Sequence, residues 1–178
     1  MMTLFRFIIA LTLSLTAISC MKSNSITAKR RGYRKACSAG SKSDCYELGL
    51  LEFHSGNSMQ AKEIFARLCT QGNMQCCYNV GIIEDGVGNT EAASKFYSIA
   101  CDNNFMIGCN AMGFLSKKAG DPGQAKNFYR RACTGGDMLG CYNIGIEEDD
   151  SGNSELAKKY LKLACEGKVK EACSRLSN

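Results

Sequence analysis

The sequence has no tryptophan, one histidine and one proline among its 178 residues. With His54 as the only imidazole, a zinc site or a Ser–His–acid triad would have to be built around that one residue. The H-E-x-x-H, K-T-G and C-x-x-C motifs and glycine-rich phosphate loops are also absent. We therefore predict no catalytic residue, no metal site and no cofactor.

The charged residues form no long block of one sign, and the formal net charge is only +5. This pattern gives no reason to expect a nucleic-acid partner. The hydrophobic run over residues 7–19 is too short to span a bilayer comfortably. It follows Arg6 and ends in Ala17-Ile18-Ser19, a small-x-small cleavage pattern. These features predict a signal peptide over residues 1–19.

Cys20 follows directly after this cleavage pattern, and the run TAISC resembles a lipobox with Ala17 in place of the usual leucine. In a lipoprotein Cys20 would become the acylated first residue, and residues 20–25 would form a tether. Ordinary signal-peptidase cleavage and an uncleaved membrane anchor are the alternatives. All three place the remaining chain outside the cytoplasm, as an outer-membrane or periplasmic lipoprotein or as a secreted protein.

The chain contains 12 cysteines, and ten of them recur at a spacing of 32 residues. One series gives the first cysteine of each C-x7-C unit and the other gives the second. The first series is Cys37, Cys69, Cys101, Cys133 and Cys165, and the second is Cys45, Cys77, Cys109, Cys141 and Cys173. A fixed period of this length is typical of repeat architectures.

Other residues follow the same period and predict two helices in each repeat. In one unit, helix A covers Cys141–Asp150 and helix B covers Ser154–Cys165, with Gly152 and Asn153 between them to end one helix and cap the next. The only proline, Pro122, falls in the first turn of another helix B, where proline is tolerated. We predict an all-α solenoid of antiparallel helix pairs over residues 26–178. It comprises about four full repeats, an N-terminal helix over 26–37 and a C-terminal stub over 171–178.

The cysteines allow two patterns of disulfide pairing. Residues eight apart in one helix lie about 12 Å apart along its axis, so a bridge within a C-x7-C unit requires a turn between the two residues. The competing pairing joins Cys45 to Cys69 and leaves Cys37 and Cys173 without partners. We favour the pairing that leaves none of the ten unpaired: Cys37–Cys45, Cys69–Cys77, Cys101–Cys109, Cys133–Cys141 and Cys165–Cys173. Cys76 stays outside both patterns, as a buried small residue, as a partner in an intermolecular bridge, or as a thiol that exchanges with the adjacent Cys77.

The run C-Y-N-I-G at Cys141–Gly145, followed by Gly152, Ala157, Leu161 and Ala164-Cys165, resembles a Sel1-like repeat and fits the spacing of tetratricopeptide helix pairs. The A-C ending of helix B and the following C-x-x-φ-G, with φ apolar, resemble the Helicobacter cysteine-rich protein family. The resemblance covers residues 26–178 and implies the same short-range disulfides. The present unit is a few residues shorter than repeats of that family, in the loop between helices A and B. The family also implies an alternative function, weak β-lactam binding or hydrolysis.

Repeat arrays usually bind partners on a concave surface lined by helix A. We predict a non-catalytic scaffold that binds a protein or peptide in such a groove, with a membrane link if Cys20 is acylated. The alternative is that the same side chains pack adjacent repeats. The candidate groove residues are Tyr46, Leu50, Tyr78, Asn79, Ile82, Asn110, Phe114, Tyr142, Asn143 and Ile146, beside a rim that changes sign from Glu84-Asp85 to Lys117-Lys118 to residues 147–150.

Overall fold

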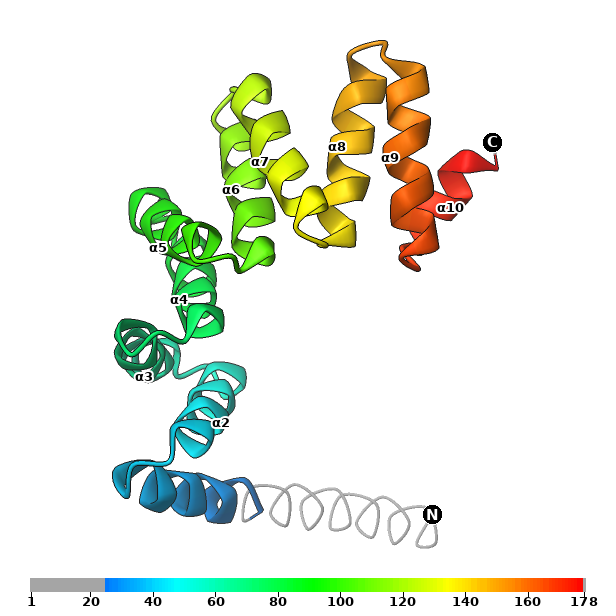
Figure 1. Ribbon diagram of the computed structural model, residues 1–178. Coiled ribbons are helices and arrows are strands. Elements are labelled where there is room, and N and C mark those ends of the chain that lie inside the picture. The colour runs from blue at the N-terminus through cyan, green and yellow to red at the C-terminus, as the bar shows by residue number, and fades with distance from the viewer. Residues whose placement is uncertain (1–24, 178) are drawn as a thin grey trace, which may run out of the picture. The chain divides into compact units, whose positions relative to one another are not determined.

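A computed structural model describes residues 25–177 as helices joined by short turns, and this range contains no strand (Figure 1). The first helix covers residues 25–38. The predicted signal peptide, Cys20 and residues 21–24 of the tether lie outside the described residues. The remaining helices are α2 (Lys42–His54), α3 (Ser58–Thr70), α4 (Met74–Gly86), α5 (Thr90–Asp102), α6 (Met106–Lys118), α7 (Pro122–Thr134), α8 (Met138–Asp150), α9 (Ser154–Glu166) and α10 (Lys170–Leu176).

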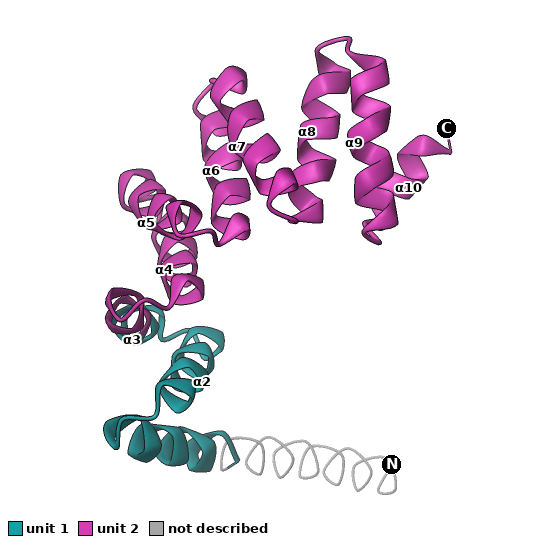
Figure 2. Cartoon of the chain, in the orientation of Figure 1, with its two compact units in different colours: residues 1–64 teal, residues 65–178 magenta. Residues whose placement is uncertain are grey.

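The chain divides into two compact units, residues 1–64 and 65–178 (Figure 2). The first contains the helix over residues 25–38, α2 and the start of α3. In the second, each helix from α4 to α10 packs against the next one in the sequence, and α6 also contacts α8. The prediction of an all-α solenoid of antiparallel helix pairs is confirmed.

The A helices begin earlier than the cysteine pattern predicted. Helix α8 starts at Met138 and not at Cys141, because Asp137 caps it by accepting a hydrogen bond from the Leu139 amide. Asn73 caps α4 in a similar way, through the Cys76 amide at 3.0 Å. The segment between the two cysteines of a unit is therefore mostly helical, with only a short turn in its middle.

One residue in each of these turns adopts the left-handed conformation, three positions after the first cysteine. Gly136 is an example, with φ of 95°. In the last unit the glycine is displaced to position 167, yet the left-handed residue is still the third one, Lys168, with φ of 68°. The turn thus keeps its left-handed backbone conformation even where the residue that adopts it is not glycine.

Five disulfides close these turns, each within one C-x7-C unit. Their Cα–Cα distances lie between 4.4 and 4.7 Å. Cys45 is joined to Cys37, and Cys69 is joined to Cys77, so the competing bridge from Cys45 to Cys69 is not formed. Each bridge ties the end of one helix B to the first turns of the next helix A.

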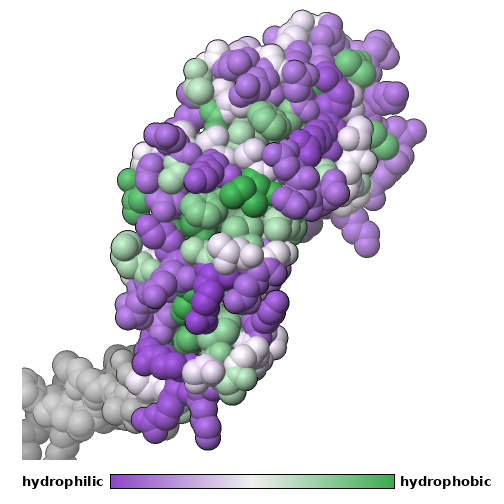
Figure 3. All heavy atoms as spheres, turned by 60° about the vertical axis from the view of Figure 1, so that its left-hand side comes forward, coloured by the Kyte–Doolittle hydropathy of each residue, from purple (hydrophilic) through white to green (hydrophobic). Residues whose placement is uncertain are grey.

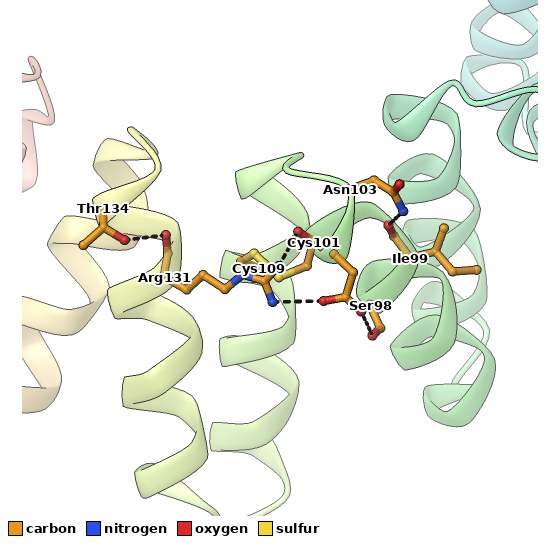
Figure 4. Close-up of a disulfide and its surroundings, with 8 residues drawn as sticks. Ser98, Ile99, Cys101, Asn103, Cys109, Arg131 and Thr134 are labelled. Atoms are coloured by element: carbon orange, nitrogen blue, oxygen red, sulfur yellow. Dashed lines mark hydrogen bonds and ion pairs between the residues drawn. A yellow bond between two sulfur atoms is a disulfide. The ribbon is translucent and has the colours of Figure 1, made fainter.

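The bridge between α5 and α6 also receives a contact from the following repeat (Figure 4). Arg131 of α7 donates from Nη2 to the carbonyl oxygen of Cys101 and from Nη1 to Oδ1 of Asp102, both at 2.9 Å. One side chain therefore satisfies a backbone carbonyl at the end of α5 and pairs with a carboxylate. This contact links neighbouring helix pairs on the side of the disulfide.

Cys76 is a buried free thiol beside the bridged Cys77. Burial raises its pKa to about 12, so the thiol stays protonated and is a poor nucleophile at neutral pH. Its counterparts Gly108 and Gly140 have no room for a side chain, because a Cβ would meet Ala100 or Ala132 at under 3.0 Å. These observations favour a packing role for Cys76 over an intermolecular bridge.

The two helices of a pair approach closely where a glycine of helix A faces a large side chain of helix B. A Cβ built on Gly113 of α6 would lie 2.5 Å from two ring carbons of Tyr129 in α7. Gly81 faces the Tyr97 ring in the same way, and a Cβ on Gly145 would meet Leu161 at 3.0 Å. The glycine column therefore sets the distance between paired helices.

Replacing Gly113 by alanine should destabilise the protein by about 1–3 kcal/mol, because the buried Tyr129 ring would have to move. The free energy of unfolding is measured by denaturant titration of the oxidised protein. Gly86→Ala is the matched control, since Gly86 lies at the end of α4 with open space around its Cβ position. It should change stability by less than about 1 kcal/mol, and equal losses in both variants would contradict this role of Gly113.

Candidate partner-binding surface

Four of the ten predicted groove residues meet at one surface pocket. Tyr78 of α4, Asn110 and Phe114 of α6 and Asn143 of α8 line a pocket with a volume of about 290 Å³. Three consecutive A helices thus contribute to one recess within residues 65–178. The other residues lining it are Asp85, Tyr97, Ile107, Ala111 and Leu139.

The other six predicted groove residues do not line this pocket, and three of them pack against neighbouring helices. Ile82 packs against the core formed by Ala93, Tyr97 and Leu115. Tyr142 and Ile146 pack against the core around α8 and α9. Asn79 is half-buried, and its amide nitrogen donates no hydrogen bond to another described residue. Tyr46 and Leu50 are half-buried residues of α2 in the first unit.

Three aliphatic or aromatic side chains at the pocket are exposed to solvent. Ile107, Phe114 and Leu139 have exposed fractions of 44%, 56% and 54%. On the face shown in Figure 3, hydrophobic residues gather in patches bordered by hydrophilic ones. Ile107 and Leu139 are not among the groove residues predicted from the sequence. Their signal lies in a repeat column that reads Ser43, Gln75, Ile107, Leu139 and Glu171, where the polar residue becomes aliphatic in two adjacent units.

The polar side of the pocket has a hydrogen bond between α6 and α8. Asn143 donates from Nδ2 to Oδ1 of Asn110 at 2.7 Å. Burial raises the pKa of Asp137 above its usual value, although interactions with the backbone amides of Leu139 and Gly140 and with Asn110 oppose the shift. The two asparagines are therefore held in fixed orientations at the pocket.

Aromatic rings pack against one another on the α4–α5 side of the pocket. The ring centroids of Tyr78 and Tyr97 lie 5.5 Å apart, and those of Tyr78 and Phe105 lie 5.8 Å apart. Burial raises the pKa of Tyr78, with a further contribution from the negative charge of Asp137. Burial also raises the pKa of Tyr97, so both phenols remain neutral hydrogen-bonding groups at physiological pH.

The charged residues predicted to form the rim of the groove pair with one another between helices. Lys117 of α6 forms an ion pair with Glu147 of α8 at 2.5 Å, and Lys118 lies 3.7 Å from Oδ1 of Asp85 in α4. Glu84, Glu147 and Glu148 are buried, so they do not form the open acidic rim that the sequence suggested.

The arrangement of the helix pairs is similar to that of several solved structures. A Sel1 repeat protein from Oxalobacter formigenes aligns with a TM-score of 0.67 and 18% identity, covering 80% of this chain and 65% of that one. A protective antigen of uropathogenic Escherichia coli with an SLR fold aligns with a TM-score of 0.70 and 19% identity, over 80% of this chain and 34% of the antigen. Cysteine rich protein B of Helicobacter pylori aligns with a TM-score of 0.55 and 22% identity, over 66% of this chain and 93% of that protein.

The chain has the Sel1-like repeat fold. No protein-family model matches the sequence, and no curated protein matches it. At these identities the likeness establishes the arrangement of the helices, and the site must be argued from its own residues.

Three of the Sel1-like hairpins bury a glutamate near the end of helix A, a column that the sequence analysis did not recognise. The asparagine five residues later donates to it: Asn57 to Glu52 at 2.7 Å, Asn89 to Glu84 at 3.1 Å, and Asn153 to Glu148 at 2.7 Å. Asn153 makes no side-chain capping bond to α9, contrary to the predicted cap. The asparagine thus fastens the turn between the two helices to the buried carboxylate.

The third hairpin replaces both members of this pair. Ser116 occupies the glutamate position and donates to the side-chain oxygen Oε1 of Gln124 at 2.8 Å. Asp121 occupies the asparagine position and accepts from the backbone N–H of Gln124 at 2.8 Å. If residue 116 were a glutamate, as in the other hairpins, it would face the Asp121 carboxylate and would have no asparagine amide to donate to it. The replacement of glutamate by Ser116 therefore compensates for the replacement of asparagine by Asp121.

Glu148 shows how a buried carboxylate is held in its charged form. Burial alone would raise its pKa, but hydrogen bonds from Asn153 and Lys126 and the charges of Lys126 and Arg130 outweigh this effect. The net result is a pKa below the usual value of 4.5. The charged carboxylate therefore stabilises the folded protein at pH values above its usual pKa of 4.5, and this contribution is lost as the pH falls through the lowered pKa.

Glu148→Gln should lower the free energy of unfolding at neutral pH by about 1–3 kcal/mol, because the charged hydrogen bonds disappear. The variant should also lose less stability than the parent on acidification below about pH 4.5, since one acid-sensitive group is gone. Unfolding is followed by circular dichroism at several pH values. Glu155→Gln, on the exposed first turn of α9, is the control and should match the parent. An identical pH profile for Glu148→Gln and the parent would contradict the assigned role.

Proposed function

We propose that the chain is an exported, non-catalytic interaction protein that binds an extended segment of a protein or peptide partner across α4, α6 and α8. The observation that carries the proposal is the pocket with Ile107, Phe114 and Leu139 exposed beside the bonded pair Asn110–Asn143. Exposed apolar side chains next to oriented polar groups are the usual composition of a recognition site.

The geometry of the A helices supports an extended ligand. The lining residues come from three A helices that follow one another at one repeat period, so equivalent positions recur along the surface. An extended chain can contact such a series with successive side chains, while amide groups such as those of Asn110 and Asn143 can bond its backbone.

The five disulfides support export. Disulfides persist in oxidising compartments and are rare where thiols are kept reduced. None of the helices formed by the described residues is both long and apolar enough to cross a membrane. We propose the signal peptide over residues 1–19 as the route of export and acylated Cys20 as the membrane anchor. The β-lactam alternative draws on no side chain of residues 25–177, and we do not propose it.

Site-directed photo-crosslinking tests both the binding surface and the compartment. A photoreactive phenylalanine analogue placed at Phe114 should yield a discrete covalent adduct in envelope fractions of the producing cells. The analogue at Lys159, an exposed position on α9 away from the pocket, is the control and should give none. Adducts of equal yield at both positions, or no adduct at Phe114 in the oxidised protein, would count against the proposal.

A further inference from the structure

Asp85 is the acidic residue that lines the pocket, and one of its oxygens is left without a hydrogen-bond donor. Oδ1 is buried and accepts no hydrogen bond from the residues that the structure describes. The nearest cation, Lys118 Nζ, lies 3.7 Å away, beyond hydrogen-bond distance, on a side chain that is 58% exposed. A buried carboxylate oxygen without a donor is costly, and a ligand that donates to it would remove that cost.

The walls beside Asp85 are aromatic. Tyr78 and Tyr97 line the same pocket, and the charge of Asp85 contributes, after burial and Tyr78, to raising the pKa of Tyr97. The carboxylate and both tyrosines thus line one recess. A planar guanidinium stacks well on aromatic rings and matches a carboxylate with two N–H donors, whereas an ammonium offers only a point charge.

The exposed part of the pocket lining is apolar. Ile107, Phe114 and Leu139 are its exposed residues, and they come from α6 and α8, whereas Asp85 belongs to α4. A ligand side chain suited to this recess needs an apolar stem for these three residues and a charged tip for Asp85. Arginine and lysine have such a stem, and they bury it along apolar surface while the tip keeps polar contact.

The charges around the pocket favour a positive ligand. Asp85 and Asp137 contribute negative charge, Lys117 is paired with Glu147, and Lys118 forms only a long ion pair with Asp85, at 3.7 Å. An acidic ligand would add repulsion, and a neutral apolar one would leave Asp85 Oδ1 without a donor.

We propose that this pocket receives a basic side chain, arginine in preference to lysine, from the extended partner segment, and that Asp85 determines this specificity. The inference rests on the proposed function, since it assumes that a partner segment lies across α4, α6 and α8.

Selection of a random peptide display library on the oxidised full-length chain tests the inference without knowledge of the partner. The enriched peptides should share one arginine or lysine. Replacing that residue by citrulline, which has nearly the same shape without the charge, should weaken binding about tenfold or more in calorimetry.

Variants of the chain locate the effect. Asp85→Asn should lower the affinity for the arginine peptide about tenfold and remove most of its advantage over the citrulline peptide. Asp102→Asn, which removes the same charge from the exposed end of α5, is the matched control and should bind like the parent. Lys118→Met should bind more tightly, because the competing cation is gone. Circular dichroism of each variant verifies that it is folded.

The possible failures are distinguishable. Enriched peptides without a shared basic residue, or equal effects of Asp85→Asn and Asp102→Asn, would overturn the inference while leaving peptide binding by the A helices intact. A library that yields no binder at all would overturn both the inference and the proposed function.

Discussion

The covalent closure of each turn between helix B and the next helix A is the constraint on which the rest of the structure depends. The buried apolar side chains form separate clusters along the chain, such as Ala93, Tyr97 and Leu115 of α5 and α6 and a larger one from α7 to α10. In the chain-entropy model a closed loop of this size contributes roughly 2–3 kcal/mol by restricting the unfolded chain. Five such bridges add to the stability of a core that is spread along the chain in separate clusters.

The candidate site is built next to these bridges. Tyr78 follows Cys77, Asn110 follows Cys109, and Ile107 and Leu139 each lie two residues before a bridged cysteine. The disulfides therefore fix the backbone from which the pocket residues project. A surface with rigid backbone loses little conformational entropy on binding, which suits it to recognising a segment that is itself flexible.

The period of 32 residues and the helix pairs could be read from the sequence, because each repeats four or five times. The starts of the A helices could not, since Asp137 and Asn73 are capping residues whose role depends on the turn before them. The buried glutamates were also missed, because charged residues are usually exposed and only the paired asparagines, as at Asn153, make their burial favourable. Likewise, Ile107 and Leu139 stand in a column that is polar in the other units, so periodicity concealed them.

In the three helix pairs that have a glutamate–asparagine pair, it and the disulfides act at opposite ends of the helix pair. Glu148 and Asn153 fasten the turn between α8 and α9, while Cys133–Cys141 fastens the turn between α7 and α8. Both kinds of contact are local in sequence, so each hairpin can be completed from its own residues. This locality is what allows single units to depart from the pattern, as Ser116 and Asp121 do together.

Amide hydrogen exchange of the oxidised protein, compared with protein that has been reduced and alkylated, tests the role of the disulfides most directly. Reduction should remove protection first around the bridged turns, over residues 98–112 and 130–144, while the centres of the helices should exchange later. Unchanged protection over these residues after full reduction would contradict it.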